Sequence, residues 1–470
     1  MVFSSIPFLF FFLPAFLILY YILPFKFKNY LLLLFSLIFY AWGEPIYILL
    51  MIFACGVDYS NGLLIEKNRN SLLKKRMLLF VSVFVNLSML GFFKYADFLI
   101  EFINYTMNLS IQPLGLELPI GISFFTFQTM SYSIDVYRDD VKVEKNFLTY
   151  LTYVSMFPQL IAGPIVRFST VNEELHKRTI DFKGFSNGIL RFMKGLFKKV
   201  LIANNIGLLW DTISAMPSVS VASAWLGAMA FTLQLYFDFS AYSDMAIGMG
   251  EMLGFHYLEN FNYSLIAKSV TDFWRRWHIS LSTWFRDYLY IPLGGNRKGK
   301  IKHIRNILVV WAITGLWHGA AWNFVLWGVY YGTLLILEKY VWGDRLSKLP
   351  NMIQHFYTVF IVLVGFIIFV FDDFNRLGNY LGLMFGINGN PIIDDNFIYY
   401  VINYGVFLMV ALIISVPIYP VLRRRILASS SKRAKAVMAG IIAAAYVILL
   451  LLTTSYLVSN TYNPFLYFRF

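Results

Sequence analysis

The sequence predicts an all-α, polytopic integral membrane protein. Of its 470 residues, 59% are hydrophobic, 19% are aromatic and only 14% are charged. Soluble domains carry roughly 25% charged residues, because a surface in contact with water needs charge. Long apolar runs alternate with short basic loops, and no segment alternates apolar and polar residues as a strand would. At ~20 residues per span, the chain has room for about 11 transmembrane helices plus re-entrant or interfacial helices.

Apolar runs long enough to reach across a bilayer occur along the whole chain. They lie at 2–23, 30–56 (interrupted by Gly43, Glu44 and Pro45), 77–93, 147–166, 185–210, 221–249, 306–341, 354–371, 398–420 and 436–457. The first basic residue, Lys26, follows the first run, so we expect a retained span and not a cleaved signal peptide. Two further stretches, 97–137 and 270–293, mix aromatic with polar and charged residues. Because polar helices at membrane depth face protein or a water-filled cavity, these two should line an interior funnel or follow the interface.

Three basic loops predict the orientation of the chain. They hold Lys67, Arg69, Lys74, Lys75 and Arg76; Arg297, Lys298, Lys300, Lys302 and Arg305; and Arg423, Arg424, Arg425, Lys432, Arg433 and Lys435. By the positive-inside rule all three face the cytoplasm. The acidic residues Asp372, Asp373, Asp394 and Asp395 and the C-terminus are then expected outside. A net charge of +13 can indicate nucleic-acid binding, but here the charge lies between apolar runs, so we expect no nucleic-acid partner.

The sequence excludes several kinds of site. Cys55 is the only cysteine, so neither an intrachain disulfide nor a multi-cysteine zinc site can form. It lies in an apolar run, where a small buried hydrophobic residue is expected. The two histidines in apolar surroundings are far apart in sequence and belong to no HExxH pattern, so we expect no metal site. Gly-rich phosphate loops and a GxSxG elbow are also missing.

His318 is the first candidate for a catalytic residue. It lies within 306–341, a segment long enough that we expect it to leave the cytoplasmic side and return as a pair of helices. An imidazole there costs desolvation energy and needs a reason. Burial keeps the ring neutral, and a neutral imidazole can take a proton from an attacking hydroxyl or thiol. Gly319 is expected to give a substrate access, and Trp317 to exclude water. The alternative is a core histidine bonded to a backbone carbonyl, with Gly315 and Gly319 serving close helix packing.

His278 lies in a second segment, 272–288, which reads DFWRRWHISLSTWFRDY. As a single helix, this segment places Trp274, His278 and Leu281 on one face, and Arg275, Ser282 and Arg286 on another. Arg275 and Arg276 can hold the phosphates of a donor such as coenzyme A or a phosphopantetheine arm. The alternative is an interfacial helix whose guanidinium groups extend to the headgroups.

Asp238 and Asp244 are acidic residues among apolar neighbours. They are six positions apart and point to different helix faces, so they do not form an acid–base dyad. We expect each to bond a local partner, with Asp238 pairing with an arginine such as Arg275 or Arg276. A solvated or interfacial position is expected for the remaining histidines, which are His176, His256, His303 and His355.

Taken in order, these segments resemble the membrane-bound O-acyltransferase (MBOAT) family, and within it the bacterial, AlgI-like branch of alginate O-acetyltransferases. The resemblance covers nearly the whole chain, so 1–470 is expected to form a single MBOAT membrane domain. It is carried by MVFSS at 1–5, FYAWGEP at 39–45, PIGISFFTFQ at 119–128, FPQLIAGPI at 157–165, the segment around Asp238 and Asp244, DFWRRWHISLS at 272–282, YIPLGGNR at 290–297, TGLWHG at 314–319 and NPFLYF at 463–468.

The resemblance implies helices around a central tunnel, through which an acyl group, usually acetyl, passes from a cytoplasmic donor to an acceptor outside. The catalytic histidine of the family matches His318, and a second important histidine matches His278. The implied function is O-acetylation of an exopolysaccharide or cell-wall glycan at the bacterial inner (plasma) membrane. No cofactor is expected to be bound permanently.

The partners follow from the same resemblance. An extracytoplasmic acetyltransferase is the expected partner, because a polymeric glycan cannot easily enter a bilayer. The expected donor is the thioester of acetyl-CoA or of an acyl-carrier phosphopantetheine, and such a polyanion would be attracted to the basic loop at 294–305. Three alternatives stay open: D-alanyl transfer to teichoic acid, a non-enzymatic glycan or lipid transporter, and a scaffold for a partner enzyme. The two halves of the chain show no evident inverted repeat, which disfavours a secondary transporter.

Overall fold

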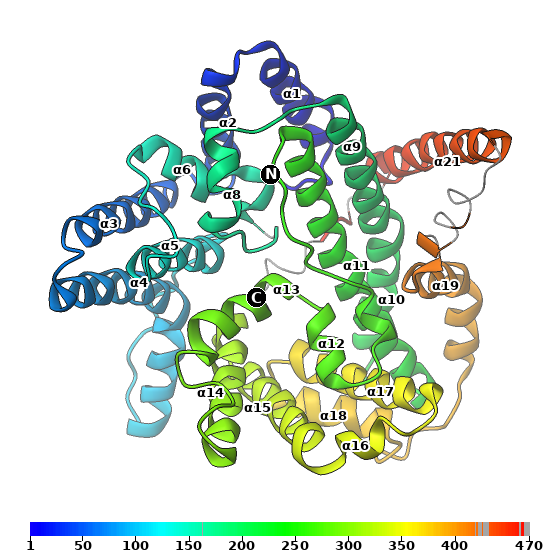
Figure 1. Cartoon of the computed structure of the whole chain (residues 1–470). Coiled ribbons are helices and arrows are strands. Elements are labelled where there is room, and N and C mark those ends of the chain that lie inside the picture. Colours follow the sequence, from blue (N-terminus) through cyan, green and yellow to red (C-terminus); the bar gives the residue numbers. More distant parts are fainter. Residues whose placement is uncertain (162, 419, 422–424, 426–431, 460–461, 465–470) are drawn as a thin grey trace. The chain divides into compact units, whose positions relative to one another are not determined.

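In a computed structural model of the chain, the described residues form helices and no strand (Figure 1). The structure describes residues 1–161, 163–418, 420–421, 425, 432–459 and 462–464. The chain divides into two compact units, which are described separately below. The first unit is Met1–Phe192 with Ser243–Glu259, and the second is Met193–Tyr242 with Asn260–Phe470. The helix α11 (Val221–Leu253) contributes to both.

The first unit is built around three packed helices, α3, α4 and α5 (Figure 1). Its helices are η1 (Phe8–Phe12), α1 (Leu13–Ile22), α2 (Phe25–Ala41), α3 (Ile48–Lys67), α4 (Leu72–Met107), α5 (Ile122–Tyr137), α6 (Phe147–Ser155), α7 (Phe157–Leu160), α8 (Phe168–His176) and most of α9 (Phe182–Phe197). At their contact, the buried carboxylate of Asp58 on α3 accepts hydrogen bonds from Ser82 and Asn86 on α4 and from Ser133 on α5. Because a buried polar group must be satisfied, this cluster fixes the three helices against one another.

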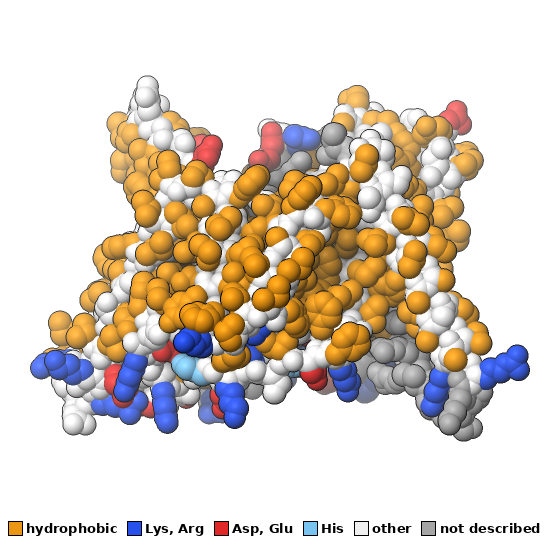
Figure 2. All heavy atoms as spheres, turned by 90° about the horizontal axis from the view of Figure 1, so that it is seen from above, with side chains coloured by type: hydrophobic (Ala, Val, Ile, Leu, Met, Phe, Trp, Pro, Cys, Tyr) orange, Lys and Arg blue, Asp and Glu red, His pale blue; other side chains and the backbone are white. Residues whose placement is uncertain are grey.

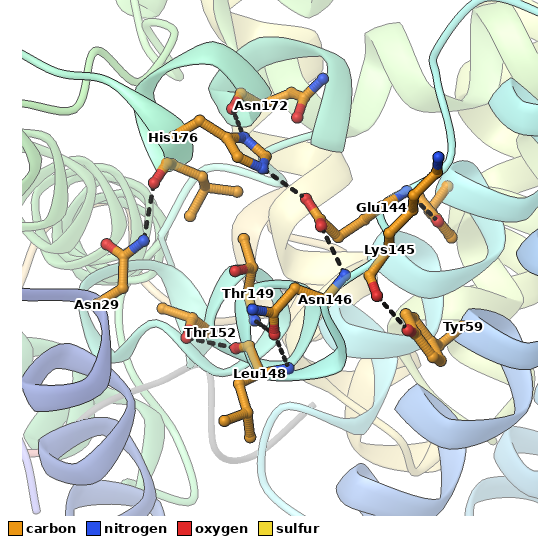
Figure 3. Close-up of polar contacts among 12 residues, drawn as sticks. Asn29, Tyr59, Glu144, Lys145, Asn146, Leu148, Thr149, Thr152, Asn172 and His176 are labelled. Atoms are coloured by element: carbon orange, nitrogen blue, oxygen red, sulfur yellow. Dashed lines mark hydrogen bonds and ion pairs between the residues drawn. The ribbon is translucent and has the colours of Figure 1, made fainter. Parts of the chain in front are cut away.

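A polar network joins the loops that flank α6 and α8 (Figure 3). Asn146 caps α6, its side chain accepting from the backbone of Leu148 and Thr149 at 2.9 and 3.3 Å. The buried Glu144 accepts from the backbone of Asn146 at 2.8 Å, and its other oxygen lies 3.0 Å from Nε2 of His176. Side-chain capping of this kind satisfies backbone donors that the first turn of a helix leaves free.

The second unit has an aromatic-rich core. Its helices are η2 (Lys198–Ala203), α10 (Asn204–Ser214), part of α11, η3 (Ser264–Ile266), α12 (Val270–Arg276), α13 (Ile279–Phe285), η4 (Arg286–Tyr290), α14 (Lys300–His318), α15 (Trp322–Leu337), η5 (Glu338–Trp342), α16 (Gly343–Leu346), α17 (Asn351–Val370), α18 (Phe374–Met384), α19 (Asp395–Ile414) and α21 (Lys432–Ser459). Trp274, Trp327, Tyr331 and Phe366 are buried in one cluster, together with apolar residues of α10 and α11. Two of the acidic residues noted above are helix caps: Asp373 caps α18 and Asp394 caps α19.

Five described helices are long and apolar enough to cross a membrane. They are Ile48–Lys67, Leu72–Met107, Asn351–Val370, Asp395–Ile414 and Lys435–Ser459. Hydrophobic side chains cover most of the face shown in Figure 2. Apolar surface of this extent is stable in lipid and not in water, so the chain is a membrane protein. The helical, membrane-embedded class is thus confirmed, whereas a count of about 11 spans stays a prediction.

One predicted span, 147–166, is wrong as a continuous helix, because it is interrupted after Ser155 and only the four residues of α7 follow as helix before 161. The interruption expected within 30–56 at Gly43, Glu44 and Pro45 is confirmed, because a turn at 42–47 divides this run between α2 and α3. Proline lacks the donor that an interior helical position needs, and glycine weakens the helix.

Candidate active site

His318 is the last residue of α14, at the turn of a helical hairpin formed by α14 and α15 (Figure 1). The two helices approach through glycines. A Cβ at Gly315 would lie 2.1 Å from the carbonyl oxygen of Phe324, and one at Gly328 would lie 2.3 Å from that of Trp311. Only glycine permits such backbone contact. The predicted outgoing and returning pair is therefore confirmed as a hairpin, with His318 at its turn.

Gly319 does not leave room for a substrate, and the expectation that it does is wrong. A Cβ at this position would lie 2.0 Å from Cε2 of Phe324. The Phe324 ring therefore fills the space that the missing side chain leaves. The close-packing alternative describes Gly315 and Gly319 correctly.

The half-buried imidazole of His318 is surrounded by aromatic rings. Its centroid lies 5.0 Å from that of Trp317, 5.2 Å from that of Trp327 on α15 and 5.2 Å from that of Phe369 on α17. Rings of this size exclude water from the faces of the imidazole. The part that remains accessible can meet a substrate, so the position suits a general base.

The segment that carries His278 is two helices, and its prediction as a single helix is wrong. α12 ends at Arg276 and α13 begins at Ile279. Between them His278 has φ +47° and ψ +54°, a left-handed conformation that non-glycine residues rarely adopt. The shared faces expected from i, i+4 spacing therefore do not form. Strained residues of this kind cluster at functional sites, which agrees with a functional role for His278.

Both histidines lie beside Trp317. The Trp317 centroid is 6.2 Å from that of His278 and 5.0 Å from that of His318. His278 is only 2% exposed, and its Nδ1 lies 3.1 Å from Oδ1 of Asn260. Its segment lies outside the five candidate spans, and burial lowers the pKa of His278 to about 3. The ring is thus neutral at physiological pH.

The partner of Asp238 is Lys199, and the predicted pairing with Arg275 or Arg276 is wrong. Lys199 Nζ lies 2.7 Å from Asp238 Oδ1, with both side chains almost fully buried. Lys199 belongs to η2, a π-helical turn between α9 and α10. Asp244, on the same helix as Asp238, pairs with Arg191 at 3.2 Å within the first unit. The expectation that the two carboxylates form no dyad is confirmed.

Arg275 and Arg276 differ in their surroundings. Arg276 Nε donates to Asp272 Oδ1 at 2.8 Å, and Nη1 donates to the backbone oxygen of Asn262 at 3.3 Å. These bonds connect α12 to the loop that precedes it. Arg275 is exposed and forms no ion pair with any residue that the structure describes. Arg276 is therefore committed to structure, whereas Arg275 is available to a ligand.

The other histidines lie at helix ends and in loops. His176 faces Glu144 (Figure 3), and His256 is exposed, with Nδ1 2.6 Å from Oε1 of Glu174. His355 lies 3.2 Å from the backbone oxygen of Ala267. His303 differs from the expectation of a solvated position, because it is buried and bonded to the hydroxyl of Tyr340.

The basic segment at 294–305 consists of a loop shaped by three glycines and the first turns of α14. Gly294, Gly295 and Gly299 have positive φ angles of 105°, 54° and 87°. Asn306 on α14 donates to the backbone oxygens of Leu293 and Gly295 at 3.3 and 2.9 Å, which holds the loop against the helix. The cations of this basic loop and of the helix start are exposed, and none forms an ion pair within the described part of the chain; Arg297 and Lys298 lie in the loop, and Lys300, Lys302 and Arg305 lie on α14.

Some of the predicted residues lie outside the part of the chain that the structure describes. Ala162, Arg423, Arg424 and the residues 465–468 lie outside the described residues. Among the residues that are described, no three His, Cys, Asp or Glu side chains are grouped as metal ligands would be. Cys55 is fully buried, as expected.

Three site residues were not found from the sequence: Asn260, Lys199 and Phe369. Asn260 is 18 positions from His278 and lies in a loop, so no helical spacing relates them. Lys199 follows Lys198 within the apolar run 185–210, and no helical spacing relates it to Asp238. Phe369 is one of several apolar residues on α17, and periodicity does not distinguish it.

Comparison with known proteins identifies the family. The family model for MBOAT, membrane-bound O-acyltransferase, matches residues 33–372. A probable alginate O-acetylase AlgI of Pseudomonas syringae is 44% identical over 389 residues, covering 82% of this chain and 75% of the relative. A peptidoglycan O-acetyltransferase of Helicobacter pylori is 34% identical, covering 86% of each chain. A teichoic acid D-alanyltransferase of Bacillus subtilis is 28% identical, covering 53% of this chain and 65% of the relative.

The matched region contains both histidines, the α14–α15 hairpin and the basic loop that precedes it. The resemblance noted in the sequence is therefore confirmed over most of the chain. This protein belongs to the membrane-bound O-acyltransferase family and is an acyltransferase.

Proposed function

We propose that this protein moves an acetyl group from a cytoplasmic thioester donor across the bacterial inner (plasma) membrane, for O-acetylation of an exopolysaccharide or cell-wall glycan. The observation that carries the proposal is the position of His318, half-buried among aromatic rings at the hairpin turn, with His278 beside the same Trp317 ring. The alginate and peptidoglycan acetylating relatives support the acyl group and the acceptor class. An extracytoplasmic transferase is the proposed partner that passes the acetyl group to the polymer.

His318 is the proposed general base. In its neutral form it takes the proton of the acceptor hydroxyl as the oxygen attacks the thioester carbonyl. The carbon–sulfur bond then breaks, and the imidazolium returns the proton to the departing thiolate. The rings of Trp317, Trp327 and Phe369 limit competing hydrolysis by keeping water away.

His278 suits a different task. A group with a pKa of about 3 is a poor proton acceptor near pH 7, so it does not serve as a second base. A neutral imidazole nitrogen can still accept a hydrogen bond. We assign His278 a hydrogen bond from a second hydroxyl of the acceptor, which orients the reacting hydroxyl toward His318.

The proposed donor site begins at the basic loop. Its five cations are exposed and lack carboxylate partners within the described chain, so they are free to attract the phosphates of coenzyme A or an acidic carrier protein. From Arg305 to His318, α14 is a continuous helix, and 13 residues span ~20 Å. A pantetheine arm entering along this helix would carry the thioester toward His318. Arg275 is a further candidate for a phosphate contact.

The D-alanyltransferase relatives favour one alternative, transfer of a D-alanyl group to teichoic acid. The test therefore identifies which acyl group is esterified to the envelope. The gene is expressed in its native host lacking the chromosomal copy, and esters released from the envelope by mild base are identified by mass spectrometry. Restored acetate supports the proposal. Restored D-alanine supports the alternative, and restoration of neither contradicts both.

A further inference from the structure

Asn260 is a fully buried amide whose oxygen meets three groups of the His278 turn. Its Oδ1 accepts from the backbone N–H of Ser280 at 3.2 Å and from the Ser280 hydroxyl at 2.9 Å. The same oxygen lies 3.1 Å from Nδ1 of His278. In addition, the backbone oxygen of Asn260 accepts from the N–H of Ile279 at 2.9 Å. One residue thus holds the strained turn at three successive positions.

These contacts determine where the hydrogen of the imidazole resides. A backbone N–H can only donate, so the amide atom that faces Ser280 must be the oxygen and not the nitrogen. An oxygen without a hydrogen can only accept, so Nδ1 of His278 must carry the hydrogen. A neutral imidazole has a single N–H, and therefore Nε2 carries the lone pair.

Nε2 of His278 is buried and has no hydrogen-bond partner within the described part of the chain. Buried polar atoms in native proteins are almost always paired, so an orphan of this kind is a candidate to bind a ligand. The ring contacts Asn260, Phe239 and Trp317, none of which is charged. No charged partner in this part of the chain therefore competes for the nitrogen.

We propose that Asn260 is a positioning residue that holds His278 in its Nδ1–H tautomer, so that Nε2 presents a lone pair to a second hydroxyl of the acyl acceptor, next to the hydroxyl that reacts. The inference rests on the proposed function, in which His278 orients the acceptor while His318 takes the proton of the reacting hydroxyl. The reverse tautomer would place an N–H at Nε2, and no lone pair would remain to accept from the second hydroxyl. Control of the tautomer by the other ring nitrogen is the usual way in which a histidine is set for its task.

Three variants of the full-length protein in lipid nanodiscs test the proposal. Asn260→Leu removes the acceptor, Asn260→Asp keeps it but adds a charge, and Ser280→Ala is the matched control, which loses one donor to the same oxygen. The assay follows release of free thiol from acetyl-CoA with a soluble sugar alcohol as acceptor, from pH 5 to pH 9. Melting midpoints are recorded for each variant.

We expect Asn260→Leu to lower kcat by about 10- to 100-fold, the usual cost of losing a group that orients a functional histidine. The KM for acetyl-CoA should change less than about twofold, because the donor does not contact Asn260. Asn260→Asp should move the acidic limb of the pH profile to higher pH, because a carboxylate beside Nδ1 stabilises the imidazolium and protonation removes the lone pair. Ser280→Ala should keep the kcat and the pH profile of the unchanged protein.

An unchanged pH profile in Asn260→Asp would overturn the proposal, even if Asn260→Leu does not fold. Equal loss of kcat in Ser280→Ala and Asn260→Leu would indicate a structural turn and also overturn it. Failure of the proposed function looks different, because His318→Gln would then release thiol as fast as the unchanged protein. If instead His278→Ala and His318→Gln lose activity while Asn260→Leu keeps it, only the role of Asn260 is wrong.

Discussion

The pair formed by Lys199 and Asp238 should be a main determinant of the stability of the second unit. The two side chains are 1% and 3% exposed, and their charged atoms are 2.7 Å apart. At an effective dielectric constant of about 20, this separation corresponds to an attraction of ~6 kcal/mol before desolvation. Removing one partner leaves the other charge buried without this ion pair, which costs ~3–5 kcal/mol. Asp238→Asn and Lys199→Met should therefore each destabilise the protein strongly.

The measurement is thermal unfolding of the detergent-purified protein, followed by size-exclusion chromatography of the fraction that remains folded. Each single variant should lose the folded peak at a temperature several degrees below that of the unchanged protein. The double variant Lys199→Met/Asp238→Leu should recover most of the loss, because an apolar pair of similar volume replaces the two charges. Single variants that melt like the unchanged protein would refute the reasoning, as would a double variant whose loss equals the sum of the two.

Further predictions concern α12, the hairpin and the basic loop. Arg276→Ala breaks a partly exposed i, i+4 ion pair and should lower the stability of the protein by no more than ~0.5 kcal/mol. A loss of stability as large as that of Asp238→Asn would contradict this role of Arg276. Gly319→Ala should destabilise the hairpin, because the new Cβ meets the Phe324 ring, and Phe324→Leu in the same chain should recover part of the loss. In a chain whose buried Cys55 is replaced by alanine, Lys300→Cys should not react with an impermeant thiol reagent applied to intact cells, because position 300 is predicted to face the cytoplasm. Strong labelling would show that the predicted topology is inverted.

The sequence predicted the class and the family because both depend on features spread along the chain. Apolar content and basic loops identify a membrane protein without any knowledge of contacts. The ordered motifs around His278 and His318 identified the family, which the comparisons confirm. His318 stood out because an imidazole among tryptophans and glycines is rare in an apolar run.

The geometry of the site could not be read from the sequence. Helical spacing across 272–288 does not apply, because the helix is interrupted at His278. The residue with the left-handed backbone conformation there is a histidine, whereas glycine is the residue that usually indicates such an interruption. Pairing of Asp238 with Lys199 depends on a π-helical turn that brings distant residues together. Gly319 was expected to open space, but a glycine also permits a neighbouring ring to occupy that space, and only the structure distinguishes the two.

The central claim is that His318 takes a proton during acyl transfer. It is tested most directly by His318→Gln, since the amide can form a hydrogen bond but cannot act as a base at neutral pH. The measurement is ester-linked acetate on envelope glycan in a host lacking the native copy, with protein level checked by immunoblot. A general base contributes ~10²–10⁴-fold to the rate, so we expect acetylation to fall at least 100-fold at an unchanged protein level. Near-normal acetylation by His318→Gln would show that the histidine is structural and that the mechanism is wrong.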